Sequence, residues 1–324
     1  MKTKPKIIVT GAAGFIGRNI VEQLNRRGHE NLLLVDHLGT DEKWQNLIGL
    51  KYEDIISPDC LLELLAADKL PKTAACVHEG ACSATTEKNA DFLLENNYRY
   101  TRILCEWSLR NGTRFVYASS AATYGDGSLG YSDDDTVTPS LRPLNMYGYS
   151  KHMFDLWALR AGLLDKIVGL KYFNVYGPYE NHKGDMRSLV QKAYHQIKRA
   201  GYIELFKSDR PDYRDGEQKR DFVYVRDAAN VTLHFALDRP DLGGLYNCGA
   251  GQARTWLDLA HALFAAMDMK PDIRFIEMPE ILRGKYQYFT QADAKKLQTV
   301  GGYTKPFASV EEGVADYVKT HLAK

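Results

Sequence analysis

Short apolar runs alternate with amphipathic stretches through the first half of the chain. The runs are rich in β-branched and aliphatic residues, a composition typical of buried strands. The expected strands cover residues 6–10, 32–36, 74–78 and 114–118, and the expected helices cover 16–27 and 92–110. Strands that alternate with helices in this way indicate βαβ units. We therefore predict an α/β fold with a doubly wound parallel sheet that helices cover on both faces.

The second half of the chain is less regular. From about residue 174 the alternation loosens, and turn-rich pieces such as 208–216 interrupt it. Two strand–helix signals return at 221–225 and 244–248. We interpret this as a second, smaller α/β domain made from separate segments. The sheet domain is expected at 1–173 with returns near 221–250 and 287–299, and the smaller domain within 174–324, mainly 174–220, 251–286 and 300–324.

Composition narrows the possible partners. The chain has 324 residues, 44% of them hydrophobic, with a formal net charge of +1. So small a net charge provides no global field for holding nucleic acid or an anionic membrane. No apolar run approaches the ~20 residues of a membrane helix, and no signal peptide is evident, so we expect a cytoplasmic protein. The five cysteines are scattered without a Cys-x-x-Cys pair, which favours reduced thiols and no metal site.

A glycine-rich turn lies between the first expected strand and the first expected helix. Gly11, Gly14 and Gly17 have the spacing Gly-x-x-Gly-x-x-Gly. Such a turn lets the backbone approach a pyrophosphate, whose charge the helix N-terminus stabilises. Asp36 ends the second strand, where a carboxylate accepts hydrogen bonds from a ribose 2′-hydroxyl and would repel a 2′-phosphate. Lys43 follows and could instead pair with that phosphate, so the choice between NAD and NADP stays open. The sheet domain is thus expected to be an NAD(P)-binding Rossmann domain.

A second motif predicts acid–base chemistry. Tyr147 and Lys151 are four residues apart, so on a helix both side chains share one face. A lysine ammonium beside a phenol is expected to lower the phenol's pKa from ~10 toward neutrality and to hold the nicotinamide ribose. Ser120 follows the strand at 114–118, at the sheet edge where ligands bind. We predict that Tyr147 and Ser120 handle a hydroxyl proton while hydride moves.

The glycine spacing and the Ser, Tyr and Lys set resemble the extended short-chain dehydrogenase/reductases, which act on nucleotide sugars. Longer strings are similar to the ADP-glycero-manno-heptose 6-epimerases within that family. These strings lie at 78–87, 172–178, 182–184, 219–225, 284–287 and 289–293. The Tyr-Phe-Asn-Val-Tyr-Gly-Pro string at 172–178 is common to many relatives, whereas Glu-Gly-Ala-Cys-Ser at 79–83 is more specific.

The resemblance also implies residue roles. Together with the glycines, the implied cofactor contacts are Phe15, Ile16, Asp36, His37, Lys43, Glu79, Gly80, Ala81, Cys82, Ser83, Asn96, Lys151, Val175 and Lys183. The implied substrate contacts are Asn174, Phe206, Ser208, Arg220 and Tyr286, with Asp185 and Lys192 at positions where this chain departs from the family pattern. Lys183 matches a residue proposed as a second acid/base, but a binding contact would explain it equally well.

The activity that the resemblance implies is epimerisation of an ADP-heptose at C6 for lipopolysaccharide inner-core synthesis. Transient oxidation to a ketone would be followed by re-reduction with the same nicotinamide. The expected cofactor is NADP, with NAD possible, tightly bound at one per subunit, and the resembled enzymes form pentamers. Two alternatives stay open: a UDP-hexose 4-epimerase or other nucleotide-sugar epimerase, and a catalytically silent NAD(P)-binding regulatory protein. A silent protein would be expected to lack Ser120, Tyr147 or Lys151, and this chain has all three.

Overall fold

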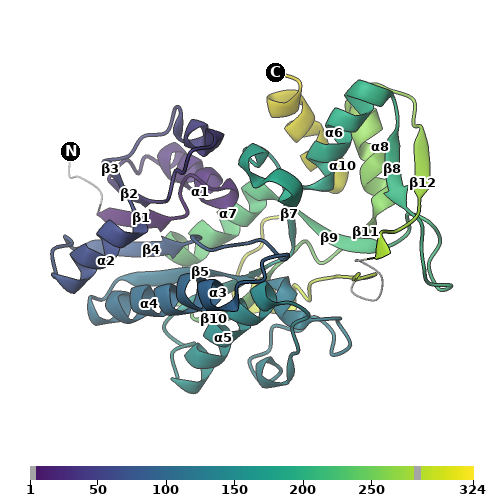
Figure 1. The fold of residues 1–324 in the computed structure, drawn as a ribbon. Coiled ribbons are helices and arrows are strands. Elements are labelled where there is room, and N and C mark those ends of the chain that lie inside the picture. The colour runs from purple at the N-terminus through teal and green to yellow at the C-terminus, as the bar shows by residue number, and fades with distance from the viewer. Residues whose placement is uncertain (1–4, 281–285) are drawn as a thin grey trace.

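A computed structural model of the chain describes residues 5–280 and 286–324. Its largest feature is a seven-stranded sheet in the order β10-β6-β5-β4-β1-β2-β3, in which every neighbouring pair is parallel. Figure 1 shows these strands side by side, with the N-terminal end of the described chain at the β1–β3 side. The strands are β1 (Lys6–Thr10), β2 (Leu32–Val35), β3 (Asp54–Ile56), β4 (Thr73–His78), β5 (Arg114–Ser120), β6 (Val168–Tyr172) and β10 (Gly244–Cys248).

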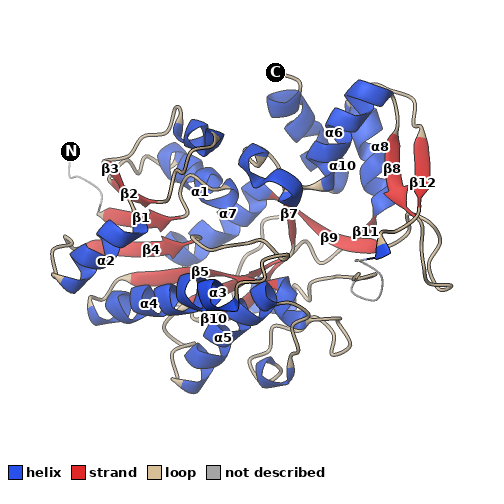
Figure 2. Cartoon of the chain, viewed as in Figure 1, coloured by secondary structure: helices blue, strands red, loops and turns tan. Residues whose placement is uncertain are grey.

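Helices cover both faces of this sheet (Figure 2). Ile7 and Val9 of β1 pack in one buried cluster with α1 and α7, whereas Ile8 packs in another with α2, α4 and α5. Successive residues of a strand point to opposite faces, so one strand serves two cores. The helices are α1 (Phe15–Arg26), α2 (Pro58–Ala66), α3 (Ala90–Leu93), α4 (Tyr100–Arg110), α5 (Met146–Arg160) and α7 (Val225–Leu233). The predicted doubly wound α/β fold is confirmed.

One predicted helix is interrupted. The stretch 92–110 forms the end of α3, a π-helical turn η2 (Leu94–Arg99) and then α4. A π-helical turn shifts the rotational phase of the residues that follow it. The interruption therefore changes which side chains of this segment face the sheet.

The later segments build smaller elements beside the large sheet. Strands β7 (Asn174–Tyr176), β9 (Lys219–Tyr224) and β11 (Ala253–Thr255) form one small sheet, and β8 (Ile203–Phe206) and β12 (Ile273–Ile276) form another. Helices α6 (Leu189–Ala200), α8 (Trp256–Ala266) and α10 (Val310–Tyr317) share a third buried cluster with them. Among the described residues, a short helix α9 (Lys295–Thr299) also precedes α10. The predicted strand at 221–225 thus pairs outside the large sheet, while α7 after it packs on α1.

The domain boundaries predicted above stay a prediction. Among the described residues, no helix is long and apolar enough to cross a membrane.

Candidate active site

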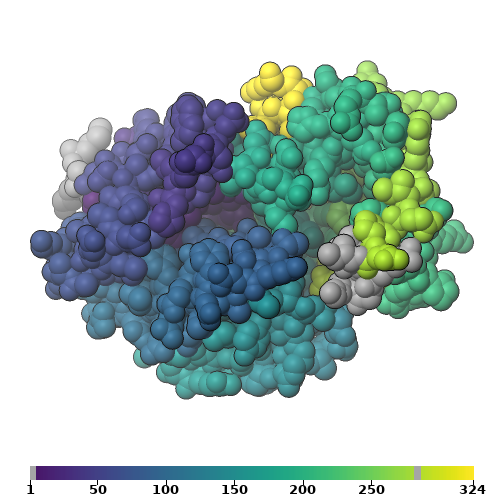
Figure 3. All heavy atoms as spheres, viewed as in Figure 1, coloured from purple at the N-terminus to yellow at the C-terminus, as the bar shows by residue number. Residues whose placement is uncertain are grey.

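A cavity of about 820 Å³ opens at the carboxyl ends of β1, β4 and β5. Its opposite wall comes from β7, α6, β8 and a short helical segment η5 (Asn181–Met186). In the space-filling view the surface is hollowed between the purple and blue first half and the teal and green second half (Figure 3). Ligands of doubly wound proteins bind at this edge of the sheet.

Most of the sequence-predicted site residues line this cavity. They are Gly11, Gly14, Phe15, Ile16, Gly17, Asp36, Lys43, Glu79, Gly80, Ala81, Cys82, Ser83, Ser120, Tyr147, Lys151, Asn174, Val175, Lys183, Lys192, Phe206 and Tyr286. Five predicted residues are outside the lining, namely His37, Asn96, Asp185, Ser208 and Arg220.

The glycine turn is packed so tightly that Gly11 and Gly17 leave no room for a side chain. Gly11 has φ +65°, and a Cβ there would lie 2.7 Å from the backbone nitrogen of Gly80. A Cβ on Gly17 would lie 2.1 Å from the carbonyl oxygen of Gly11. Helix α1 begins at Phe15, directly after this turn, so its free N–H groups face the cavity wall. The loop therefore fits a pyrophosphate that approaches the backbone closely.

Asp36 lies at the end of β2, where the adenosine ribose of a cofactor would bind. Its Oδ2 accepts the Ala13 N–H at 2.8 Å, and its Oδ1 accepts from the Lys43 Nζ at 2.5 Å. His37 takes part through its carbonyl oxygen, which accepts from Lys43 at 3.0 Å. A carboxylate and an ammonium thus stand together, so the site carries one group suited to a hydroxyl and one suited to a phosphate.

The predicted Ser, Tyr and Lys set is brought together by β5 and α5. Asn145 caps α5 by accepting the Gly148 N–H at 2.8 Å, which starts the helix just before Tyr147. Ser120, the last residue of β5, interacts with the Tyr147 side chain, and both residues line the cavity. The Lys151 Nζ donates to the Ala118 carbonyl of the same strand at 2.8 Å.

The charge state of this set differs from the sequence prediction. Burial raises the pKa of Tyr147, and the influence of the Ser120 hydroxyl offsets only part of that rise. Burial also lowers the pKa of Lys151 to about 8, against the opposing charge of Glu79. The predicted lowering of the phenol's pKa by Lys151 is therefore wrong for the protein alone, because desolvation of the phenol outweighs it.

Glu79, a predicted cofactor contact, is also hydrogen-bonded to another side chain of the protein. Its Oε1 accepts from the Tyr172 hydroxyl at 2.9 Å, and that hydroxyl also lies 2.7 Å from Thr232 Oγ1. Burial raises the pKa of Glu79 to about 7, which Tyr172 and the Lys151 charge partly oppose. The charges of Glu79 and Lys151 thus influence each other at the cavity wall.

Asn97 is a residue that sequence reasoning missed, one position from the predicted Asn96. It is 1% exposed, and its Nδ2 donates to the Cys82 carbonyl at 2.9 Å and to Ser150 Oγ at 3.0 Å. Its Oδ1 accepts the Cys82 N–H at 2.9 Å. The side chain therefore ties the loop after β4 to α5. The Asn-Asn pair was the available signal, but the π-helical turn decides which amide faces inward.

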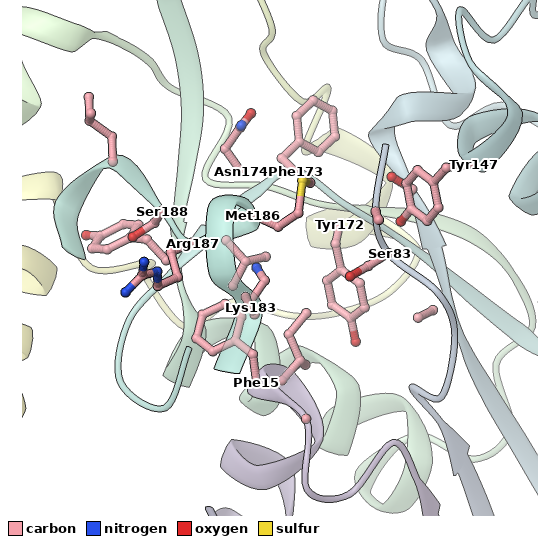
Figure 4. Close-up of a pocket in the computed structure, with 18 of the residues that line it drawn as sticks. Phe15, Ser83, Tyr147, Tyr172, Phe173, Asn174, Lys183, Met186, Arg187 and Ser188 are labelled. Carbon is pink, nitrogen blue, oxygen red and sulfur yellow. The ribbon is translucent and has the colours of Figure 1, made fainter. Parts of the chain in front are cut away.

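Lys183 lies over the cavity on η5. Its Nζ is 4.9 Å from the centre of the Phe15 ring, and Figure 4 shows both side chains reaching into the space near Met186. Burial lowers the pKa of Lys183, which the nearby Glu180 partly opposes. Glu180 is fully buried and accepts from the Ser188 N–H and hydroxyl, each at 2.5 Å. These bonds hold both ends of the segment that carries Lys183.

Arg220 stands behind the cavity wall at the substrate end. Its guanidinium lies 5.0 Å from the Tyr286 ring centre and 5.7 Å from that of Trp256, two side chains that line the cavity. Trp256 Nε1 donates to the Tyr286 hydroxyl at 2.7 Å, which fixes the two rings against each other. Gly284 and Lys285 of the 284–287 string lie outside the described residues.

The other predicted substrate residues make local contacts. Lys192 Nζ donates to the Asp185 carbonyl at 3.1 Å, so Asp185 is held through its backbone. The Ser208 N–H donates to Asp215 Oδ1 at 2.8 Å within the charged 208–218 segment. Among residues 5–280 and 286–324, no group of three or more His, Cys, Asp or Glu side chains is arranged to hold a metal ion.

A glycine loop before a helix, in one cavity with a serine, a tyrosine and a lysine, defines a nicotinamide-dependent site of the short-chain dehydrogenase/reductase class. The profile of the NAD dependent epimerase/dehydratase family matches residues 7–249, and the chain belongs to that family. Membership confirms the predicted nicotinamide-dependent enzyme class.

Individual relatives make the comparison finer. The chain is 55% identical over 317 residues to an ADP-L-glycero-D-manno-heptose-6-epimerase of Nitratidesulfovibrio vulgaris, covering 98% of each chain. It is 48% identical over 330 residues to the protein of that name from Fusobacterium nucleatum, again covering 98% of each. The crystal structure of the Helicobacter pylori ADP-L-glycero-D-manno-heptose-6-epimerase superposes with a TM-score of 0.83 at 28% identity, covering 99% of this chain and 97% of that one. The predicted resemblance to these epimerases is confirmed.

Proposed function

We propose that this protein converts ADP-D-glycero-β-D-manno-heptose to the L-glycero epimer by inverting C6. The observation that carries the proposal is one cavity that joins the glycine loop to Ser120, Tyr147 and Lys151. Near full-length identity of 55% to a protein named for this reaction selects the substrate over the UDP-hexose alternative. The same three side chains argue against a catalytically silent protein.

The residues of the chain divide the work as follows. Tyr147 accepts the proton of the C6 hydroxyl, and the nearby Ser120 hydroxyl would share that proton. The bound nicotinamide supplies the acceptor, and later the donor, of the C6 hydride. The Lys151 ammonium and the positive charge of an oxidised cofactor both favour the phenolate form of Tyr147. The sugar is then a ketone at C6, with its proton held on the tyrosine.

Inversion needs space as well as acid–base groups. The exocyclic C6 must turn about its bond to the ring and present its other face before hydride returns to it. Rotation about that one bond leaves the ADP moiety and the sugar ring in place, so the substrate does not have to leave the cavity between the two hydride transfers. The proton returns to the C6 oxygen from Tyr147 or from Lys183, whose pKa burial lowers.

The remaining site residues suit binding. The helix N-terminus at Phe15 would hold the cofactor's pyrophosphate, and Asp36 and Lys43 its adenosine ribose. Arg220, Lys192 and Tyr286 would hold the ADP-heptose, with the guanidinium suited to a diphosphate.

NADP is the proposed cofactor, with NAD also accepted, because Lys43 neutralises Asp36 and offers a partner to a 2′-phosphate. Lys43→Ala should weaken NADP binding ~10-fold, or about 1.4 kcal/mol, and leave NAD binding within ~2-fold, since only the 2′-phosphate loses its ionic partner. Calorimetry with each dinucleotide would measure this. Equal weakening of both would show that Lys43 does not read the phosphate.

A homo-oligomer, pentameric by resemblance, and a cytoplasmic location complete the proposal. Light scattering after gel filtration would measure the first, and cell fractionation the second. A monomer at micromolar concentration would contradict the assembly without touching the reaction.

The reaction itself is tested by proton NMR of ADP-D-glycero-β-D-manno-heptose incubated with purified protein and no added cofactor. Growth of the L-glycero anomeric signal is expected, and it would also establish a retained, recycled nicotinamide. No conversion, even with NAD or NADP added, would overturn the heptose assignment and make UDP-galactose the next substrate.

A further inference from the structure

A buried ion pair lies beneath the catalytic set, outside the cavity lining. Asp155 is one helical turn after Lys151 on α5 and is 0% exposed, and Lys171 on β6 is 1% exposed. Their Oδ2 and Nζ atoms are 2.7 Å apart. Burying two charges costs more than burying apolar side chains of equal volume, so stability alone does not account for the pair.

Both carboxylate oxygens of Asp155 are bound to β5. Oδ1 accepts from the Tyr117 hydroxyl at 2.8 Å, and Oδ2 accepts from the Ser119 hydroxyl at 2.8 Å as well as from Lys171. Ser119 directly precedes Ser120 in the strand. The carboxylate therefore ties the helix that carries Tyr147 to the strand that ends at Ser120.

The lysine of the pair continues the connection to Ser120 from the other side. Lys171 Nζ donates to Thr123 Oγ1 at 2.8 Å, and the Thr123 hydroxyl donates to the Ser120 carbonyl at 2.8 Å. The Ser120 Oγ in turn accepts the Ala122 N–H at 3.1 Å, inside the turn η3 (Ala121–Tyr124). Ser120 is thus held before and after its own position by one charged network.

We propose that the Asp155–Lys171 pair is a positioning device that fixes Ser120 against Tyr147, so that its loss lowers turnover while substrate and cofactor binding persist. The readout through turnover rests on the proposed epimerase function. Small misplacements of reacting groups cost large factors in rate, about 10²-fold for 1 Å, whereas binding depends on many other contacts.

The main variant replaces both charges by apolar side chains, Asp155→Leu with Lys171→Met, so that neither charge is left buried alone. A lower melting temperature is expected because the Tyr117 and Ser119 hydroxyls lose their acceptor, together with KM within ~3-fold and kcat per cofactor-loaded site reduced ~10–100-fold. Lys171→Arg keeps a positive charge and a donor beside Asp155, so its kcat should stay above that of the apolar-pair variant.

A matched control is Asp133→Asn. Asp133 is 4% exposed and accepts the Asn247 N–H at 2.7 Å, but it does not line the cavity. The Asp133→Asn variant should keep kcat within ~2-fold, because it alters a buried carboxylate that is not bonded to β5 or α5. Unchanged kcat in the apolar-pair variant would overturn the proposal. So would a Lys171→Arg variant whose kcat, KM and cofactor loading are impaired as much as those of the apolar-pair variant.

A second readout does not depend on the substrate. Crystal structures of the apolar-pair variant and of the wild type should differ by about 0.5 Å or more in the distance between the Ser120 and Tyr147 hydroxyls, the tolerance expected of a catalytic constellation. An unchanged distance would overturn the positioning role. If the wild type fails to convert the heptose but the distance changes as expected, the proposed substrate fails while the positioning role stands.

Discussion

The two walls of the cavity are held in different ways. Ser120, Tyr147 and Lys151 lie on β5 and α5, where buried side-chain hydrogen bonds and an ion pair connect helix to strand. Lys183 and Lys192 lie on the facing wall, where they contact an aromatic ring and a backbone carbonyl. The first wall is preorganised for one proton transfer, whereas the lysines of the second wall are suited to binding charged groups of the substrate. This difference predicts that variants of the first wall change kcat, and that variants of the second change KM more.

The largest effect is expected from Tyr147→Phe. Removing the phenol oxygen removes the proton acceptor, so kcat should fall ~10²–10⁴-fold, the usual contribution of a positioned acid or base. KM should stay within ~3-fold, because the ring still packs in place. NMR time courses at several substrate concentrations give both constants. Near-normal turnover would remove Tyr147 from its assigned role.

Lys183→Ala tests whether the second wall also handles a proton. If Lys183 returns the proton to C6, kcat should fall ~10²-fold. The matched variant is Lys192→Ala, which removes a lysine of the same wall and should raise KM with little change in kcat. An effect of Lys183→Ala confined to KM would show that this lysine only binds. It would also agree with the prediction that variants of the second wall change KM.

The pH dependence of cofactor binding should separate the walls further. The pKa of Lys151 is lowered to about 8, so its ammonium is present below pH 8 and lost as the pH rises through that value. We expect cofactor affinity to fall ~10-fold between pH 7 and 9, measured by fluorescence titration, because the ribose loses a charged donor. Lys151→Met should bind weakly with little dependence on pH in this range. An equal slope in that variant would assign the titration to another group, with Glu79 the first to examine.

The smallest effect is expected from Arg220→Lys. The charge is kept, but the planar guanidinium that lies near the Trp256 and Tyr286 rings is lost. KM should rise ~3–10-fold while kcat stays within ~2-fold, as steady-state assays would measure. A fall in kcat with KM unchanged would place Arg220 among the groups that stabilise the transition state.

The first wall was predictable because its signals are local. Gly11 to Gly17 and Tyr147 to Lys151 each lie within one short segment, and parallel strands deliver their carboxyl ends to one edge of the sheet. Their arrangement in one cavity therefore follows from topology, whereas their charge state does not. The pKa of Tyr147 depends on burial that segments far apart in the chain provide, which is why the sequence prediction of a lowered value was wrong.

The second wall was predictable only through resemblance. Arg220 and Tyr286 meet through Trp256, which comes from a third segment, and no spacing in the chain indicates that contact.

The distinction between Asn96 and Asn97 depends on a π-helical turn that periodicity does not reveal. The Asp155–Lys171 pair was also missed, because an aspartate on an amphipathic helix ordinarily faces water.

The most direct test of the account is the epimerisation of ADP-D-glycero-β-D-manno-heptose in D₂O, followed by proton NMR of C6 in the product. Transfer of hydride from C6 and its return to the same carbon keeps the original hydrogen, so the L-glycero product should carry protium at C6. Deuterium at C6 would contradict the account, because it would mean that the C6 hydrogen leaves as a proton and that Tyr147 does not act together with a hydride carrier.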